Sequence, residues 1–319
     1  MWSYIVRRLV QALFILFIIT AVCFLLTRLS SDPMAQYATR QNMTAADRMA
    51  LRARLGLDQP LPVQYVKWLG LALQGNLGES FFSHQKVSLL ISQRLPMTLI
   101  LMTTAEIFIV IISLFLGIVS AIKQYSLTDN LITSFSFIGY SMPIFFIALG
   151  LILIFAVKFK LWGLPYFPTG ADVWNFKDPL AMVWHLVLPV TCLVAIQVAG
   201  YSRFLRSSIL EVLGQDYVRT ARAKGLMERA VLYKHAMRNA ALPFVTILGL
   251  DIPFLLGGAL VTESVFAWPG MGRLFWEYAQ RGDFPVVNGV LLVVSGAVVF
   301  FTIVTDVAYT FIDPRIRLS

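Results

Sequence analysis

Acidic residues within strongly apolar runs are the side chains of this sequence best suited to chemistry. Glu106, Asp251, Glu263 and Asp306 lie in or near such runs. A carboxylate inside a membrane is costly and usually faces a cavity or a partner. Asp251 is mid-run, so it is the first candidate to line a path and face an ammonium group; a hydrogen bond to a neighbouring helix is the alternative. The candidate path residues are Asp251, Pro253, Gly257, Gly258 and Glu106.

The remaining residues contain no pattern typical of a catalytic site or a metal site. The three histidines are scattered, with no HExxH, and Cys23 and Cys192 lie in apolar runs without a CxxC. GxxxxGK[ST], the usual phosphate-cradling loop, is also absent. We therefore predict no catalytic residue, no metal site and no cofactor bound by this chain. An intramembrane enzyme remains a rival that lacks a nucleophile and base.

A second unusual stretch, YVRTARAKGL, occupies residues 217–226 and is cationic and rich in small residues. On a helix, Tyr217, Thr220, Ala221, Lys224 and Gly225 share one face with few large side chains. Such a face would let another backbone approach closely, which predicts a docking surface for a soluble partner. The alternative is the ordinary excess of basic residues in cytoplasmic loops.

The composition places these residues in a membrane protein. Of the 319 residues, 58% are hydrophobic and 13% are charged, against about 25% charged in soluble domains. Each membrane-spanning helix needs roughly 20 apolar residues, and prolines within the runs predict kinks. The first run is read as a retained helix, because no small-x-small signal-peptide cleavage site follows it. The six expected spans are Leu9–Thr27, Pro96–Ile122, Leu131–Val157, Met182–Ser202, Ala240–Val261 and Pro285–Ile312.

Basic residues predict that both termini lie inside. With that orientation the cytoplasmic segments hold thirteen Lys and Arg, and the short outer loops hold five. The long outer loop from about Arg28 to Arg94 holds eight more, but loops longer than about 60 residues largely escape the positive-inside rule. The net charge of +9 therefore reflects topology, and no nucleic-acid partner is expected.

The long outer loop is expected to form a small cap. Thr44 and Asp47 have the spacing of a helix N-terminal cap, and a second amphipathic helix should open at Pro60 and Pro62 and close near Gly75. Two interfacial helices lying on the bilayer are the alternative.

The stretch VFAWPGMGRLFWEYAQRGDFP at residues 265–285 is too polar to span a membrane. Its Trp-Pro-Gly predicts a turn, followed by a short amphipathic helix over 272–281. We expect either a re-entrant outer gate or an interfacial aromatic anchor. The candidate gate residues are Trp268, Pro269, Gly270 and Phe275.

Four stretches resemble ABC importer permeases of the dipeptide, oligopeptide and nickel class. DYVRTARAKGLMERAVLYKHAMRNAALP resembles their cytoplasmic coupling loop, although the Glu and first Ala of the general Glu-Ala-Ala-xxx-Gly motif are replaced by Arg219 and Thr220. Residues 75–101, 262–292 and 313–317 resemble other parts of the same permeases. The resemblance implies that the coupling residues are Asp216, Tyr217, Arg219, Thr220, Ala221, Arg222, Ala223, Lys224 and Gly225.

The resemblance also implies a fold and a set of partners. The fold would be an all-α type I importer permease: a first transmembrane helix over 1–29, an extracytoplasmic cap over 30–95, and a five-helix core over 96–319 with a cytoplasmic loop at 203–239. The partners would be a second homologous permease, two ABC ATPase subunits that hold ATP and Mg, an extracytoplasmic solute-binding protein, and lipid of a prokaryotic inner membrane.

Peptides are the expected solute, with glutathione, a nickel chelate or another small solute as alternatives in the same class. A secondary transporter driven by an ion gradient is the more distant rival. Such folds usually contain repeated halves, and residues 1–160 and 161–319 show no clear self-similarity.

Overall fold

The computed structural model describes residues 2–30, 34, 44–54, 56–170 and 178–312, and this part of the chain is almost entirely helical. Its one isolated β-bridge joins Glu79 and Lys86. Five described segments are long and apolar enough to cross a membrane: Val6–Leu29, Val87–Ile122, Ile144–Leu161, Pro179–Leu213 and Phe284–Thr305. Helix α11 (Met237–Val265) lies where a further span is expected. The all-α membrane class is confirmed, whereas six spans with both termini inside stay a prediction.

The chain forms two compact units, each described here by itself. The first unit contains residues 1–98 and 270–303, and the second contains residues 99–269 and 304–319. The division falls within the long helices α4 (Val87–Ile122) and α13 (Phe284–Ile312).

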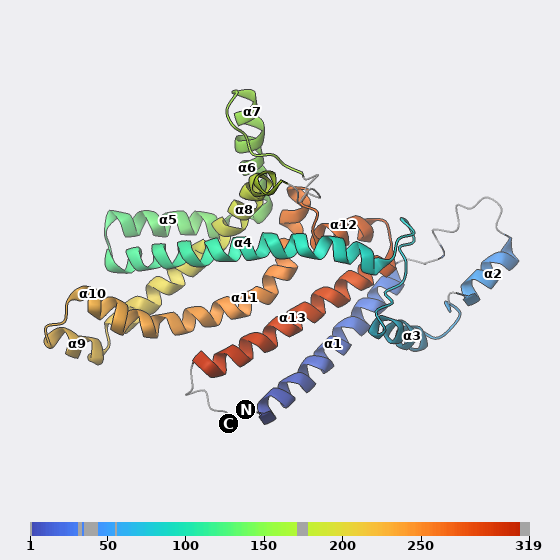
Figure 1. Ribbon diagram of the computed structural model, residues 1–319, viewed down its shortest axis with the longest axis horizontal. Helices are drawn as coiled ribbons and strands as arrows, with labels where there is room; N and C mark the ends of the chain where they lie inside the picture. Colours follow the sequence, from blue (N-terminus) through green and yellow to red (C-terminus); the bar gives the residue numbers. More distant parts are fainter. Residues whose placement is uncertain (1, 31–33, 35–43, 55, 171–177, 313–319) are drawn as a thin grey trace. The chain divides into compact units, whose positions relative to one another are not determined.

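In the first unit, helix α1 (Trp2–Ser30) packs against α3 (Leu61–Leu73), as Figure 1 shows. The Tyr65 hydroxyl lies 2.8 Å from Thr20 Oγ1, and the Tyr65 ring meets Phe24 edge-on with centroids 5.6 Å apart. The Pro60 start predicted for α3 is confirmed, because Pro60 is its N-cap and Gly75 follows its end with φ +81°.

The short helix α2 (Ala45–Arg54) begins with the predicted cap. The Thr44 backbone N–H and hydroxyl both donate to the Asp47 carboxylate, at 3.0 and 2.7 Å, and the Asp47 N–H donates back to Thr44 Oγ1 at 3.2 Å. These hydrogen bonds hold the pKa of Asp47 below its ordinary value. Two donors of the helix end are thereby satisfied.

The core of the first unit joins the start of α4, the start of α13 and α12 (Met271–Gln280). Ser80 Oγ and the Phe82 N–H donate to the Asp283 carboxylate at 2.6 and 3.0 Å. A Cβ at Gly289 would lie 2.5 Å from Val87 Cγ1, so glycine is required where α13 crosses α4. The buried residues of this core are Val87, Leu90, Ile91, Met271, Leu274, Tyr278, Val286, Val287 and Val290.

The expected span Leu131–Val157 is not one helix. Helix α5 (Leu127–Ser141) ends at Met142, and α6 (Ile144–Leu151) begins after Pro143. Met142 has ψ 131° because the proline ring disfavours the helical region for the preceding residue. Figure 1 shows α6 turning away from the direction of α5 at this break. The segment then continues through a π-helical turn, η2 (Ile152–Lys158), and α7 (Phe159–Leu161).

Helix α8 (Pro179–Leu213) is the centre of the second unit and contacts α5, α6 and α11. Backbones come close at two glycines: a Cβ at Gly117 would lie 3.0 Å from the Ser202 carbonyl oxygen, and one at Gly139 would lie 3.1 Å from that of Ala195. Small residues at such crossings are typical of membrane helices, whose packing relies on close van der Waals contact.

A buried ion pair fixes the turn between α4 and α5 to α8. Arg206 on α8 donates from Nε to Asp129 Oδ1 at 2.8 Å and from Nη2 to Oδ2 at 2.7 Å. The Asp129 side chain is 3% exposed, and the Ser120 hydroxyl and Tyr125 N–H also donate to it. The bidentate guanidinium is the main cause that holds the pKa of Asp129 well below its ordinary range.

Replacing Asp129 with Asn should destabilise the protein by about 3 kcal/mol, because breaking a buried pair leaves the other charge without compensation. The measurement is equilibrium unfolding in detergent. Asp216→Asn is the matched control, since its pair with Arg219 is 3.7 Å long and its side chain is 98% exposed; it should cause no measurable change. Equal losses in the two variants would contradict the assigned role.

The same pair should make stability depend on acid pH. A carboxylate whose pKa is lowered by folding contributes stability above its unfolded pKa, about 3.9, and loses it as pH falls through the folded value. The difference in unfolding free energy between the wild type and Asp129→Asn should therefore be constant from pH 7 to 5 and shrink below pH 4. A difference that is unchanged at pH 3 would show that the carboxylate's charge is not what matters.

Candidate functional site: the coupling loop

The cationic stretch folds into a short helix at the end of α8. Helix α9 (Asp216–Ala223) follows α8 after Gly214 and Gln215. Lys224 is the C-cap of α9. The next residue, Gly225, has φ +76°, a conformation that glycine adopts without strain. The chain returns through α10 (Glu228–Ala230) and a second π-helical turn, η3 (Val231–Ala236), into α11. We name residues 214–236 the coupling loop after the role expected for them; Figure 1 labels both α9 and α10 within it.

The coupling loop has a small core of its own. Val218 and Val231 are fully buried, and Ala221 is 6% exposed. Val212 and Leu213 in the last turn of α8 pack against these three residues. Helix α9 is therefore attached to the end of α8 by side-chain packing as well as by the chain.

This core corrects the sequence interpretation at Ala221. The predicted open face contained Ala221, but the structure turns this residue inward, whereas its neighbour Ala223 is exposed. The reason is that Val218 and Ala221 are three residues apart on a helix and form the apolar stripe that must be covered. A bulky residue at Ala221 would disrupt the loop itself, so such a variant would not test docking.

Polar contacts hold the remaining face in place. Asn239 Nδ2 on α11 donates to the Tyr217 hydroxyl at 2.8 Å, and the Thr220 hydroxyl donates to the Asp216 carbonyl at 2.9 Å. Arg222 makes a two-point ion pair with Glu228 across the loop, with contacts of 2.9 and 3.3 Å. The loop is thus bound to both α8 and α11.

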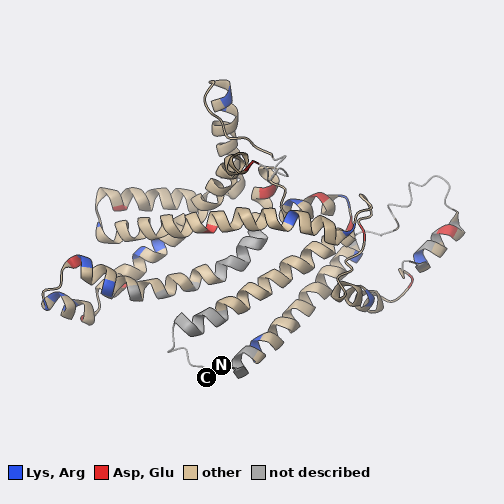
Figure 2. Ribbon diagram, viewed as in Figure 1, with Lys and Arg blue, Asp and Glu red and all other residues tan. Residues whose placement is uncertain are grey.

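The exposed surface of α9 is charged. Figure 2 shows basic and acidic residues gathered at α9 and α10. Arg219 pairs only loosely with Asp216, at 3.7 Å with 73% and 98% of the two side chains exposed. Lys224 is exposed and makes no ion pair with a described residue. This surface presents cationic side chains to whatever approaches the loop.

The candidate path residues lie on two helices. Glu106 is partly buried on α4. The other four, Asp251, Pro253, Gly257 and Gly258, fall in α11, but their side chains lie outside the described residues. Their role in a path stays a prediction. Asp306 is expected to pair with an arginine near the inner surface instead, and its side chain also lies outside the described residues.

Three of the candidate gate residues, Trp268, Pro269 and Gly270, follow directly after a tight turn at Ala267, whereas Phe275 lies on α12. Ala267 has φ 52°, and the next residue, Trp268, is 2% exposed. The expected amphipathic helix is confirmed as α12, which buries Leu274 and Tyr278 and packs Phe275 against the core of the first unit. Pro269 and Gly270 are also buried. Their predicted role as an outer gate is not tested by these positions.

Sequence reasoning missed the residues that fix the turn between α4 and α5 to α8 and those that attach α9 to α8. Asp129 carries one local signal, because Ser126 lies three residues before it in a helix-start pattern and its hydroxyl accepts from the Asp129 N–H at 3.3 Å. Nothing in the sequence relates it to Arg206, 77 residues later. Val218 could have been found, since it is the one branched apolar side chain in α9.

No group of three or more His, Cys, Asp or Glu side chains able to hold a metal occurs among the described residues.

Comparison with known proteins identifies the family. Residues 113–318 match the family described as binding-protein-dependent transport system inner membrane component, and residues 1–102 match its N-terminal region. A putative peptide permease protein of Brucella ovis is 42% identical over all of both chains. The oligopeptide transport system permease protein AppB of Bacillus subtilis is 41% identical over 99% of this chain and all of that protein. The glutathione transport system permease protein GsiC of Escherichia coli is 37% identical over 99% of each.

A solved structure supports the fold. An amino acid ABC transporter crystallised with histidines aligns with a TM-score of 0.51 and 16% identity, over 71% of this chain and 94% of that one. At this identity the likeness concerns the fold alone. The family match and the full-length relatives show that this chain belongs to the binding-protein-dependent transport system inner membrane components. With its several apolar helices, it is a multi-pass protein of the inner membrane.

Proposed function

We propose that this chain is the permease subunit of an ATP-driven ABC importer of peptides, in which the coupling loop transmits the work of a separate ATPase. Full-length similarity to proteins named as peptide and oligopeptide permeases carries the proposal. The coupling loop supports it physically, because α9 has a packed core and a charged outer surface.

Each part of the coupling loop has a task in this mechanism. Arg219, Lys224 and the small exposed Ala223 form the surface that an ATPase subunit grips. Val218 and Ala221 lock α9 onto α8, so that a displacement of α9 moves α8 as well. Arg206 then passes that displacement to the turn between α4 and α5 through Asp129.

The remaining partners follow from the same proposal. This chain would form half of a translocation path with a second homologous permease, and an extracytoplasmic binding protein would deliver the solute. ATP and Mg would be held by two ATPase subunits and not by this chain, which would contribute no catalytic residue. The coupling loop would face the cytoplasm, with both termini on the same side.

Glutathione is the second candidate solute, because the Escherichia coli glutathione permease is 37% identical over nearly all of both chains. Glutathione is itself a small peptide, so the two candidates share a chemical class. The proposed path through α11 would serve either.

Uptake should require ATP. In vesicles that contain this chain with its operon partners, labelled tripeptide should accumulate only when ATP is supplied inside, and an ionophore that collapses proton and sodium gradients should leave uptake unchanged. Uptake that survives without ATP and stops with the ionophore would indicate a secondary transporter instead. Labelled glutathione in parallel vesicles separates the two candidate solutes.

Replacing Ala223 with Trp should separate the ATPase from the permease without unfolding the loop. The side chain is exposed, so the indole would block close approach rather than break the core. We expect ATPase copurification and solute-stimulated ATP hydrolysis to fall at least about tenfold, a loss of roughly 1.4 kcal/mol in binding. Gln124→Trp, at an exposed position in the turn between α4 and α5, is the matched control.

Full ATPase copurification with Ala223→Trp would refute the docking surface while leaving the transport function intact. Ala221→Trp should differ from both variants, because it overfills a buried position and should expose the loop to proteolysis.

A further inference from the structure

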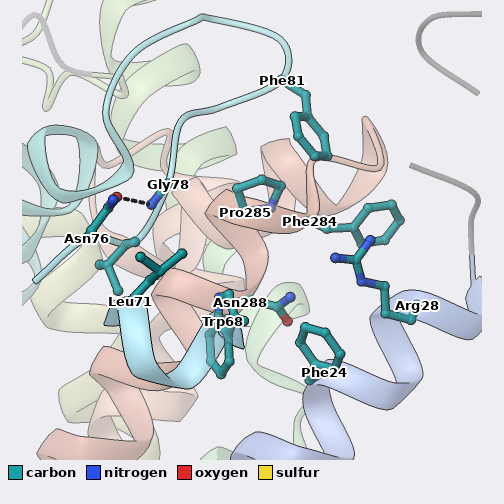
Figure 3. A pocket seen from close by; sticks show the side chains of 11 residues that line it. Phe24, Arg28, Trp68, Leu71, Asn76, Gly78, Phe81, Phe284, Pro285 and Asn288 are labelled. Carbon is teal, nitrogen blue, oxygen red and sulfur yellow. Dashed lines mark hydrogen bonds between the residues drawn. The ribbon is translucent and has the colours of Figure 1, made fainter. Parts of the chain in front are cut away.

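A cavity in the first unit is lined by one cationic side chain, that of Arg28, and by several aromatic rings. It measures about 120 Å³ and lies among α1, α3, the segment after α3 and the start of α13. On the same measure a water molecule needs roughly 10–15 Å³, so a tetrahedral phosphate group has room. The lining residues include Phe24, Arg28, Trp68, Phe81, Phe284 and Asn288; Figure 3 shows them around the space.

Arg28 is the chemically unusual member of this set. Its Nε is buried and has no hydrogen-bond partner. The guanidinium carbon lies 5.2 Å from the centroid of the Phe24 ring. A cation–π contact of this kind contributes about 0.5–1 kcal/mol at exposed sites, which does not replace the anion that a partly buried guanidinium normally pairs with.

Two described carboxylates, Glu79 and Asp283, are adjacent in sequence to lining residues of the cavity. Glu79 is exposed and forms no ion pair with Arg28, and Asp283 is occupied elsewhere. Asp283 accepts hydrogen bonds from Ser80 and from the Phe82 N–H. Arg28 therefore has no anionic partner among the described residues, and an anion from outside the chain would supply one.

Asn288 provides a second donor that faces the same space. The Thr27 hydroxyl donates to Asn288 Oδ1 at 3.1 Å, which orients the amide. Figure 3 shows this amide facing the region between Phe24 and Arg28. A guanidinium and an oriented amide NH₂ together match the oxygens of one anionic group.

The membrane level of the cavity indicates what kind of anion can reach it. The apolar segment of α1 ends at Leu29, and that of α13 begins at Phe284. The cavity thus lies where both helices meet one membrane surface, the level of phospholipid headgroups and of aromatic side chains. Next to Arg28, α1 exposes Leu25, Leu26 and Leu29, which offer an apolar surface for an acyl chain.

From this arrangement we propose that the cavity is a binding site for the phosphate of a membrane phospholipid, held by Arg28 and Asn288. The aromatic wall and the exposed leucines take the glycerol and acyl parts. The lipid would fasten α1 and α3 to α13 at that surface, because the cavity is lined by all three helices.

The test uses the purified transporter complex, stripped of lipid by detergent exchange and titrated with dioctanoyl phosphatidylglycerol under native mass spectrometry. Dioctanoylglycerol, which lacks the phosphate, should bind at least about tenfold more weakly to the wild type. Inorganic phosphate alone should not compete at equal concentration. This comparison needs no variant, so it holds even if a mutant complex fails to assemble.

Variants then locate the site. Arg28→Gln should weaken binding at least about tenfold, and Arg28→Lys should restore most of it, because a lysine still offers a point charge to phosphate. Arg281→Gln is the matched control: Arg281 lies in the same unit, 4.3 Å from the Phe82 ring centroid, but outside the cavity. It should bind like the wild type.

Four results would overturn the proposal. The first two are that dioctanoylglycerol, or inorganic phosphate, binds the wild type as tightly as dioctanoyl phosphatidylglycerol does. The third is that Arg28→Gln and Arg281→Gln weaken lipid binding by the same factor. The fourth is that a tripeptide displaces the lipid. The last result would assign the cavity to a peptide carboxylate instead.

Discussion

The pairing of Asp129 with Arg206 is the constraint on which the second unit depends. An ion pair with one partner almost fully buried is unfavourable unless its hydrogen bonds are complete. Here the carboxylate accepts from a guanidinium fork, a serine hydroxyl and a backbone N–H. These contacts require the end of α4, the start of α5 and the C-terminal part of α8 to stay together.

Close helix packing makes this pairing geometrically possible. Gly117 on α4 lets the backbone approach Ser202, one turn before Arg206, and Gly139 on α5 does the same at Ala195. In lipid there is little hydrophobic driving force between helices, so close contact and polar bonds must supply the stability. The two glycines and the ion pair therefore depend on one another: larger side chains at the glycines would move the guanidinium out of reach.

Local signals made much of the helix pattern predictable. The Thr44–Asp47 cap, the proline start of α3 and the turn before α12 each depend on neighbours within a few residues. Asp129 with Arg206, and Asn288 with Thr27, join residues far apart in the chain, so no spacing rule finds them. For α9, periodicity gave the residues that share a face but not which face is inward, so Ala221 was expected on the open face although it is buried. Pro143 predicted a kink, but the structure has a complete helix end there, because Met142 adopts an extended conformation with ψ 131° before the proline.

The coupling loop is attached to both of its neighbours by connections of different kinds, and this bears on the proposed mechanism. Only Gly214 and Gln215 separate α9 from α8, and the inner face of α9 packs on the last turn of α8. Toward α11 the chain passes through η3, a π-helical turn, and π-turns are rare and occur mostly at functional sites. A displacement imposed on α9 would therefore reach α8 through rigid packing and then the α4–α5 turn through Asp129. Helix α11, which carries the candidate path residue Asp251, would follow through η3, whose Val231 belongs to the same small core, and through the hydrogen bond from Asn239 to Tyr217.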